Sequence, residues 1–400
     1  MKVGFLGGTF DPLHNGHLAL AEDSLTSGGL DRLVVIPAGT TVHKPVDRVS
    51  GAGMRYWMCR LGFQGMDSVE VSRCEALRDH GSYTIDTIRE LRRSLDPGDE
   101  LHMVCGADIL FDLLHWRFPQ DIMRETAILA SLRPGHDRTS FEARAAFLRD
   151  EYGARIRFFD ARQVDVSSTG IRMAVASGDD ISDRMPQNVA RFVRDAGLYA
   201  PDNPLDTLTA EQTECLRHAE RILLEIHDGP RLEHSLLTMT TAARLAARFG
   251  LDIYSAALAG LVHDCAKGLP RQQALSFVDP ADHATAAEPK LHHGPAGAVL
   301  AKDLFGIGDR TVLDAIRYHI TGRAGMTPVE MAVYIADKTE PSRRYPGVDA
   351  VRTRMLDNLE DAFLLSAGSF AAILSERGMK AHPDMLAAIS ELERRHPIDH

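Results

Sequence analysis

The chain has 400 residues, of which 44% are hydrophobic and 25% are charged, with a formal net charge of −11. This length exceeds one ordinary hydrophobic core, so we expect two domains; the acidic balance argues against a nucleic-acid binder, which needs a basic surface. Five scattered cysteines without a CxxC spacing indicate reduced, cytoplasmic thiols, and the apolar runs are too short to predict a signal peptide or a membrane span.

Strand-like and helical patterns alternate from the first residues to about residue 200. The strand-like runs cover residues 3–7, 32–38, 68–72, 100–108, 126–132 and 155–159. Strands that alternate with helices predict an α/β domain, in which a Rossmann-like parallel sheet is wrapped by helices.

The pattern changes near residue 200, because almost every later segment has helical periodicity. Residues 198–212 lie between the two patterns and contain two prolines, an asparagine and several helix-capping residues. We therefore expect an α/β domain over residues 1–200 and an all-α domain over residues 208–400.

The first turn of the chain has an unusual composition. The string "VGFLGGTFDPLHNGH", residues 3–17, runs from a predicted strand through Gly7 and Gly8 into a helix that begins near two histidines. Glycines let a backbone approach an anion closely, and a helix start offers free N–H groups to phosphate. The string is neither a dinucleotide GxGxxG motif nor a P-loop.

This string resembles the signature of the nucleotidylyltransferases that carry an HxGH motif. Further strings occur in the same order as in bacterial nicotinate-nucleotide adenylyltransferases, at residues 37–45, 81–91, 105–117, 132–136 and 166–172. The resemblance implies transfer of an adenylyl group from ATP, accompanied by Mg²⁺, to nicotinate mononucleotide. Val42 departs from the family, which usually has proline before the His-Lys pair.

The chemistry of this transfer suits the residues of these strings. His14 and His17 can act as hydrogen-bond donors, Lys44 as a mobile cation and Arg172 as a bidentate fork on phosphate oxygens. "SSTGIR", residues 167–172, is typical of a capped helix start. The resemblance assigns the nucleotide-binding positions to Gly7, Gly8, Thr9, Phe10, Thr84, Gly106, Asp108, Trp116, Arg133, Ser168 and Thr169, with Trp116 stacked on the pyridine ring.

The second half contains histidines and aspartates at five stations. They occur in the order His, His-Asp, His, His, Asp, within "RLEHSL", "AGLVHDCAKG", "HHGPAGA", "RYHITG" and "YIADKTEP". Imidazole and carboxylate without thiolate favour a hydrolytic iron, manganese or zinc site. Because adjacent helical residues point about 100° apart, the His-Asp pair can serve two metals at once.

This order resembles the HD phosphohydrolase superfamily, and its flanking strings resemble the subgroup that splits diadenosine tetraphosphate symmetrically at a di-iron centre. The resemblance assigns the metal ligands to His234, His263, Asp264, His293, His319 and Asp337. His292 is a rival for His293. Lys267 would hold a phosphate oxygen, and Arg323 and Arg343 are weaker candidates for the same work.

The sequence thus predicts a bifunctional cytoplasmic enzyme that makes nicotinate adenine dinucleotide and hydrolyses diadenosine tetraphosphate to two ADP. Two alternatives stay open for the helical half: hydrolysis of another nucleotide, such as a guanosine alarmone, or a non-catalytic nucleotide sensor that regulates the first domain. A homo-oligomer is possible, and neither nucleic acid nor a membrane is an expected partner.

Overall fold

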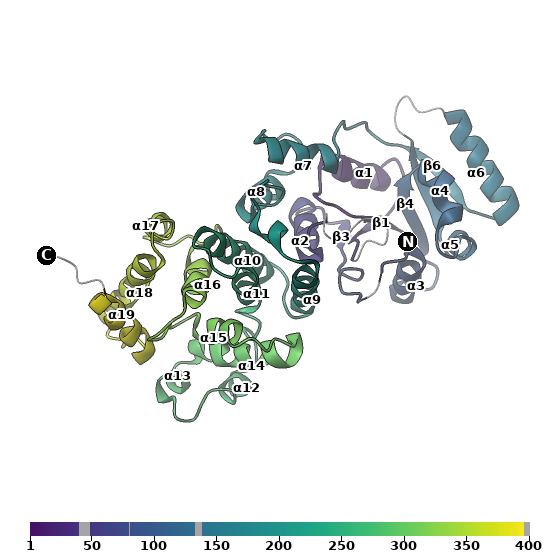
Figure 1. Cartoon of the computed structure of the whole chain (residues 1–400). Helices are drawn as coiled ribbons and strands as arrows, with labels where there is room; N and C mark the ends of the chain where they lie inside the picture. The colour runs from purple at the N-terminus through teal and green to yellow at the C-terminus, as the bar shows by residue number, and fades with distance from the viewer. Residues whose placement is uncertain (40–48, 80, 133–137, 396–400) are drawn as a thin grey trace. The chain divides into compact units, whose positions relative to one another are not determined.

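The computed structural model describes residues 1–39, 49–79, 81–132 and 138–395. It divides into two compact units, which Figure 1 shows in purple to teal and in teal to yellow. The first unit holds Met1–Arg194 and Tyr199–Pro201, and the second holds Asp195–Leu198 and the chain from Asp202 onward.

The first unit is built on a six-stranded sheet in which every pairing is parallel. Its strands are β1 (Lys2–Gly8), β2 (Arg32–Pro37), β3 (Val69–Val71), β4 (Glu100–Gly106), β5 (Ala127–Leu132) and β6 (Ile156–Asp160). The strand order is β3-β2-β1-β4-β5-β6. The chain therefore adds strands toward one edge of the sheet from β1 to β3 and toward the other edge from β4 onward, so the order reverses between β1 and β4. Ligands of open parallel sheets bind at the carboxyl ends of the strands beside such a reversal.

Helices follow the strands of this sheet, as the alternating sequence predicts. They are α1 (Asn15–Leu25), α2 (Ala52–Gly62), α3 (Thr84–Ser94), α4 (Ile109–Asp112), η2 (Leu113–His115), α5 (Pro119–Glu125), α6 (Arg138–Tyr152), α7 (Ser168–Ser177) and α8 (Gln187–Ala196). Strand residues two apart, such as Val3 and Phe5 of β1, share one buried cluster with Ile85 and Ile88 of α3. The predicted α/β class is therefore confirmed.

The second unit is helical throughout the residues that the structure describes. Its elements are η3 (Pro204–Thr207), α9 (Ala210–Ile226), α10 (Pro230–Arg248), α11 (Ile253–Val262), α12 (Arg271–Leu275), α13 (His283–Ala287), η4 (Pro289–Leu291), α14 (His293–Phe305), α15 (Arg310–Tyr318), α16 (Pro328–Thr339), α17 (Val348–Arg354), α18 (Leu359–Glu376) and α19 (Pro383–Arg395). The predicted all-α class is confirmed as well.

Helix α11 is the centre of the second unit. It contacts α9, α10, α15 and α16, and every residue from Ser255 to Val262 is buried. Gly260 allows the closest approach to α10, because a Cβ there would lie 3.0 Å from the carbonyl oxygen of Thr238. This packing fixes the end of α11, where the His-Asp pair lies.

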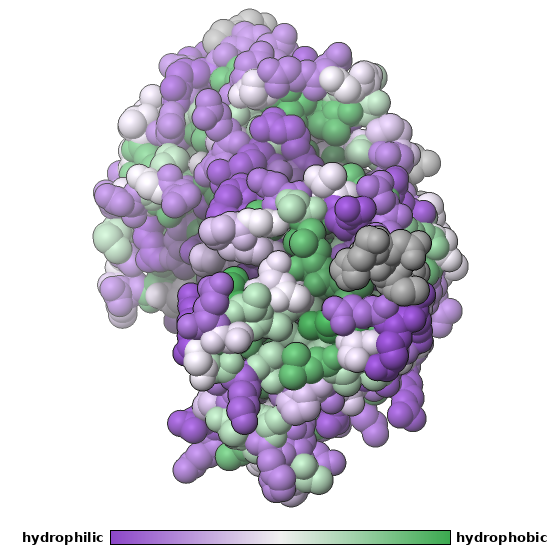
Figure 2. Space-filling view, turned by 90° about the vertical axis from the view of Figure 1, so that its left-hand side faces the viewer, coloured by the Kyte–Doolittle hydropathy of each residue, from purple (hydrophilic) through white to green (hydrophobic). Residues whose placement is uncertain are grey.

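The surface of the second unit is mixed in polarity. Figure 2 shows green apolar residues that interrupt a largely purple polar face. Exposed apolar side chains on α18 and α19 include Leu365, Phe370 and Leu386. Across the described residues, none of the helices is both long enough and apolar enough to cross a membrane.

Candidate functional sites

The turn after β1 places the two histidines of the first unit against each other. The His14 and His17 rings are stacked with centroids 3.7 Å apart, and the Phe10 ring meets the His17 ring edge-on at 4.8 Å. The backbone N–H of His14 donates to Nδ1 of His17 at 3.2 Å. Because Nδ1 accepts this bond, the proton of a neutral His17 lies on Nε2, where it can be donated.

Glycines make this stacked geometry possible. A Cβ on Gly16, between the two histidines, would lie 3.1 Å from the His14 ring, and a Cβ on Gly8 would lie 3.0 Å from the Phe10 ring. A Cβ on Gly7 would meet nothing within 4 Å. The glycine of the H-N-G-H string is therefore needed for packing of the first histidine.

Helix α7 docks on the same turn through its first residues. Ser167 is the N-cap, because its Oγ accepts from the backbone N–H of Gly170 at 3.1 Å. Ser168 Oγ donates to the Pro12 carbonyl at 3.0 Å, and Arg172 Nη1 donates to the Asp11 carbonyl at 2.7 Å. The structure thus brings the predicted residues of "SSTGIR" to the turn that carries the histidines.

The other predicted nucleotide-binding residues follow β4 and precede α3. Gly106 ends β4, and a Cβ there would lie 2.3 Å from Oδ1 of the exposed Asp108. Thr84 begins α3, and half-buried Trp116 follows η2. The Arg117 guanidinium lies 4.3 Å from the centre of the Tyr83 ring, so the segments of Thr84 and Trp116 adjoin. Lys44 and Arg133, also predicted here, lie outside the described residues.

Arg55 is a site-forming residue that the sequence analysis missed. Its side chain is fully buried on α2 and donates to main-chain carbonyls of the segments that follow β1 and β2, namely those of Thr9 at 3.0 Å, Ala38 at 2.5 Å, Gly39 at 2.9 Å and Ser50 at 2.9 Å. A lone arginine within the otherwise apolar run "MRYWM" is the signal that could have identified it.

Tyr199 was missed as well. Its hydroxyl donates to Oδ1 of Asp11 at 2.7 Å, while the backbone N–H of Ser50 donates to Oδ2 of the same carboxylate at 3.3 Å. The contact joins residues 188 positions apart, so no local pattern could have indicated it.

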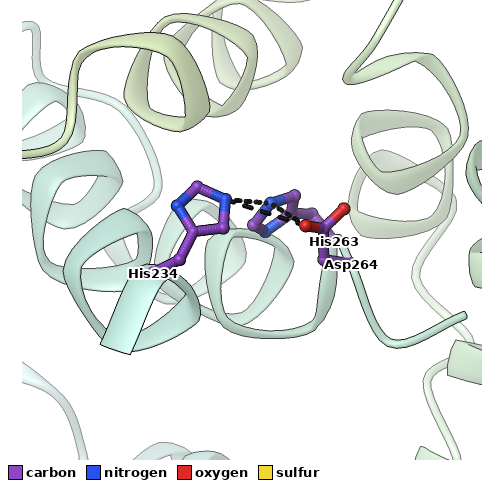
Figure 3. A group of neighbouring side chains, drawn as sticks. All are labelled: His234, His263 and Asp264. Atoms are coloured by element: carbon purple, nitrogen blue, oxygen red, sulfur yellow. Dashed lines mark hydrogen bonds and ion pairs between the residues drawn. The ribbon is translucent and has the colours of Figure 1, made fainter. Parts of the chain in front are cut away.

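The six predicted metal ligands of the second unit converge on one place. They come from α10, the end of α11, the start of α14, the end of α15 and from α16. Figure 3 shows His234, His263 and Asp264 turned toward one another. Three overlapping groups could each hold an ion: His234 with His263 and Asp264; His263 with His319 and Asp337; and Asp264 with His293 and His319.

Asp264 lies between two sets of imidazoles. Its Oδ2 lies 3.6 Å from Nε2 of His263 and 3.8 Å from Nε2 of His234, whereas Oδ1 lies 3.2 Å from Nε2 of His293 and 3.5 Å from Nε2 of His319. Oδ1 is buried and accepts no hydrogen bond of ordinary geometry from the described residues. A buried carboxylate oxygen of this kind is suited to a cation, so the site fits a metal.

Asp337 completes the first set. Its Oδ1 lies 3.1 Å from Nε2 of His234 and 3.6 Å from Nε2 of His263. Arg343 donates to the same oxygen at 2.6 Å, and Lys338 donates to Oδ2 at 2.5 Å. Asp337 therefore lies beside the imidazoles on the Oδ2 side of Asp264, and it forms a group with His263 and His319.

Each inner histidine is oriented by a bond to its other ring nitrogen. Nδ1 of His263 lies 2.8 Å from the Gly260 carbonyl, and Nδ1 of His319 lies 2.7 Å from the Ile316 carbonyl. Donation by Nδ1 leaves the lone pair on Nε2, which points into the cluster.

The cluster favours an ionised Asp264 and a neutral His319, whereas bonds to Asp337 and Glu340 outweigh burial and raise the pKa of His234. Burial acts to raise the pKa of Asp264, but the neighbouring imidazoles of His263, His293 and His319 outweigh it and hold the pKa well below its usual range. Burial lowers the pKa of His319 to about 4. For Asp264 and His319 these are the protonation states that metal ligands require.

The remaining candidates separate into two kinds. Lys267 Nζ donates to Oδ2 of Asp264 at 2.8 Å and is partly exposed, so it lies at the mouth of the cluster. Arg323 instead forms a bidentate pair with Glu330, which is structural. His292 points Nε2 at the Ala286 carbonyl, and it is His293 that faces Asp264.

Comparisons with known proteins match the two halves of the chain to different families. Residues 5–174 match the cytidylyltransferase-like family, and residues 231–342 match the HD domain family. Half of the chain is 36% identical to a probable nicotinate-nucleotide adenylyltransferase of Moorella thermoacetica, of which the match covers 92%. A probable nicotinate-nucleotide adenylyltransferase of Neisseria meningitidis is also 36% identical, with 50% of this chain and 98% of the relative covered.

Among solved structures, a protein of Clostridium acetobutylicum described as a predicted HD superfamily hydrolase involved in NAD metabolism is 36% identical. That match covers 44% of this chain and 96% of the other, with a TM-score of 0.43. A Plasmodium falciparum nicotinic acid mononucleotide adenylyltransferase complexed with NaAD is 15% identical, covers 50% of this chain and 97% of the other, and has a TM-score of 0.40.

The fold and the matches define a nucleotidyltransferase-type domain joined to an HD domain. Since the first half spans nearly the full length of relatives more than 30% identical to it, the chain belongs to the nicotinate-nucleotide adenylyltransferase family.

Proposed function

We propose that the first unit transfers the adenylyl group of ATP to nicotinate mononucleotide, forming nicotinate adenine dinucleotide and pyrophosphate in NAD biosynthesis. The observation that carries this proposal is the docking of Arg172 and Ser168 on the turn of His14 and His17. Family membership supplies the substrate class.

In this reaction the phosphate of nicotinate mononucleotide attacks the α-phosphorus of ATP, and the bond to the β-phosphate breaks. The nucleophile already carries charge, so the protein needs mainly to position the reactants and to neutralise charge that spreads over the phosphates. Nε2–H of His17, the Arg172 guanidinium and the N–H groups at the start of α7 are the donors for that work.

Mg²⁺ would enter on the phosphates of ATP. The Asp11 carboxylate beside the turn already accepts bonds from Tyr199 and Ser50, which suits a metal that arrives with its nucleotide. The test of this function is formation of nicotinate adenine dinucleotide by the purified chain from ATP and nicotinate mononucleotide. Its absence with Mg²⁺ present would refute the proposal.

We propose that the second unit is a dinuclear metal phosphohydrolase. His234, His263, Asp264 and Asp337 would hold one ion, and Asp264, His293 and His319 would hold the other, with Asp264 between them. The bound metals supply an activated water and positive charge for the attacked phosphate. Imidazole and carboxylate ligands suit iron, and also manganese or zinc.

The substrate proposed for this centre is diadenosine tetraphosphate, which one water would split at the central phosphoanhydride bond into two ADP. Lys267, Lys338 and Arg343 lie around the cluster and are partly exposed, so they can bind phosphate oxygens of a polyanion. Six convergent ligands support catalysis over a purely sensory role.

A substrate panel tests the hydrolase proposal. The full chain is incubated with Fe²⁺, Mn²⁺ or Zn²⁺ and with diadenosine tetraphosphate, a guanosine polyphosphate or ATP, and the products are separated by chromatography. ADP as the sole product of diadenosine tetraphosphate supports symmetrical cleavage. AMP with ATP as products, or turnover of the guanosine compound alone, would contradict it.

A further inference from the structure

A cavity of about 900 Å³ lies in the second unit, and none of the six cluster residues lines it. Its walls come from the second half of α10, the segment that follows α16, and α17 with the residues after it. The lining residues that matter below are Thr241, Arg244, Arg248, Arg344, Tyr345 and Arg352. Its volume is in the range of small-molecule sites.

The cavity is positively charged. Four arginines but only two aspartates, Asp195 and Asp349, are among its lining residues. Asp349 pairs with Arg352 at 3.0 Å. All four guanidinium groups also donate to main-chain carbonyls. Arg244 donates to those of Thr240 and Asp195, and Arg248 donates to that of Leu356. Arg344 donates to those of Pro341 and Arg343, and Arg352 donates to those of Thr339, Glu340 and Arg343. A carbonyl accepts the bond without cancelling the charge, so the cavity attracts anions.

The wall of the cavity away from the arginines is less polar. Thr241 lines it, but the residue is 5% exposed and its Oγ1 is buried, so its hydroxyl is not presented to a ligand. Beside it the wall is apolar and includes Leu245, Tyr345 and Pro346.

We propose that this cavity binds a nucleotide, separately from the metal centre. The phosphates would lie against the arginines, and the base would lie against the Tyr345 ring and the apolar wall. A free phosphate would use only the charged half of the cavity. The site goes beyond both proposed reactions, because neither uses any residue of its walls.

The same short segment serves the cavity and the metal centre. Thr339 and Arg344 line the cavity, whereas Asp337 and Arg343 face the cluster. Arg352, a cavity residue, donates to the carbonyls of both Thr339 and Glu340 at 2.9 Å. A nucleotide held by Arg352 and Arg344 would therefore stabilise the segment that carries a metal ligand, so it is placed to act as an effector of the hydrolase.

Hydrogen–deuterium exchange of the full chain, titrated with ADP, adenosine or pyrophosphate, locates binding by peptide. We expect ADP to slow exchange in peptides covering residues 241–248 and 339–356, and adenosine to do so only at far higher concentration. Arg248→Gln, at an exposed position, should weaken this protection by roughly tenfold or more. Arg310→Gln, with the same charge change far along the chain on α15, should leave it unchanged.

Tyr345→Ala separates base from phosphate recognition, and should weaken the response to ADP but not the response to pyrophosphate. Absence of ADP protection in the cavity peptides of the wild-type chain would overturn the proposal. Equal protection in Arg248→Gln would do so too. Pyrophosphate that protects as strongly as ADP would mean an adventitious anion site only.

Discussion

The buried carboxylate of Glu340 lies 3.1 Å from Nδ1 of His234, so the imidazole is held with Nε2 toward Asp337 and Asp264. Glu340 is itself fixed by the backbone N–H and the hydroxyl of Ser342, at 2.6 and 2.5 Å. Bonds from His234 and Ser342 outweigh burial and lower the pKa of Glu340, so it stays ionised. Carboxylate–histidine–metal chains of this kind raise the basicity of the ligand.

Glu340→Gln keeps the shape of the side chain but removes its charge. We expect the affinity for metal to fall by about tenfold or more, as with other supporting residues of metal sites. Metal content after dialysis against graded chelator measures this, with the exposed Glu376→Gln as the control. Wild-type metal retention by the variant would show that Glu340 does not support the centre.

His17→Ala tests the turn of the first unit. The residue is half-buried at the turn that we propose to bind phosphate, and it is not in the core, so the domain should stay folded. Loss of a preorganised donor should lower formation of nicotinate adenine dinucleotide by roughly a hundredfold or more. Turnover is measured by coupled assay beside the exposed His283→Ala, which should behave as wild type. A folded variant with wild-type activity would show that His17 has no role in the mechanism.

Arg55→Lys tests whether one buried guanidinium holds the loops after β1 and β2. Lysine cannot reach four carbonyls at once, and each buried acceptor left without a donor costs about 1–3 kcal/mol. We expect a drop in the free energy of unfolding of roughly 2 kcal/mol or more, measured by denaturation, together with a higher KM for ATP. Arg60→Lys, on the exposed side of the same helix, should change neither quantity.

Substrate choice tests the proposal that the pyridine ring binds near Trp116, in a pocket that presents backbone N–H groups. The carboxylate of nicotinate mononucleotide accepts hydrogen bonds, whereas the amide of nicotinamide mononucleotide presents donors that would face backbone N–H groups. We expect kcat/KM to favour the acid by roughly a hundredfold or more. Equal kcat/KM for the two mononucleotides would show that the pyridine ring does not bind in such a pocket near Trp116.

Much of this architecture could be predicted from local sequence patterns. The alternation of short apolar runs with helical segments suffices for a parallel sheet, because strand pairing of this kind needs helical crossovers. The histidines and aspartates of the second half could be predicted as metal ligands from their order along the chain and from what the resemblance to the HD phosphohydrolase superfamily implies. The structure brings these six residues together in three overlapping groups of three.

The supporting residues could not be predicted in the same way. Arg55 bonds to carbonyls 5 to 46 positions away along the chain. Tyr199 bonds to a residue 188 positions away, and Glu340 bonds to one 106 positions away. A buried arginine or glutamate in a helix has no periodicity of its own, and only the folded chain shows which carbonyl or imidazole it meets. The resemblance favours His293 over its rival His292, and the structure places His293 beside Asp264.

The central claim is that each half of the chain carries its own chemistry. Asp264→Ala removes the carboxylate between the two sets of imidazoles, so bound metal and hydrolysis of diadenosine tetraphosphate should both be lost. In the proposed mechanism, adenylyl transfer uses His14, His17 and Arg172 instead, so we expect it to persist.

The decisive measurement follows metal content, diadenosine tetraphosphate cleavage and nicotinate adenine dinucleotide synthesis in one preparation of Asp264→Ala, alongside the wild-type chain. We expect no bound metal, no cleavage and near wild-type synthesis in the variant. Retained cleavage would contradict the metal centre, and loss of both activities in a folded protein would contradict the independence of the two halves.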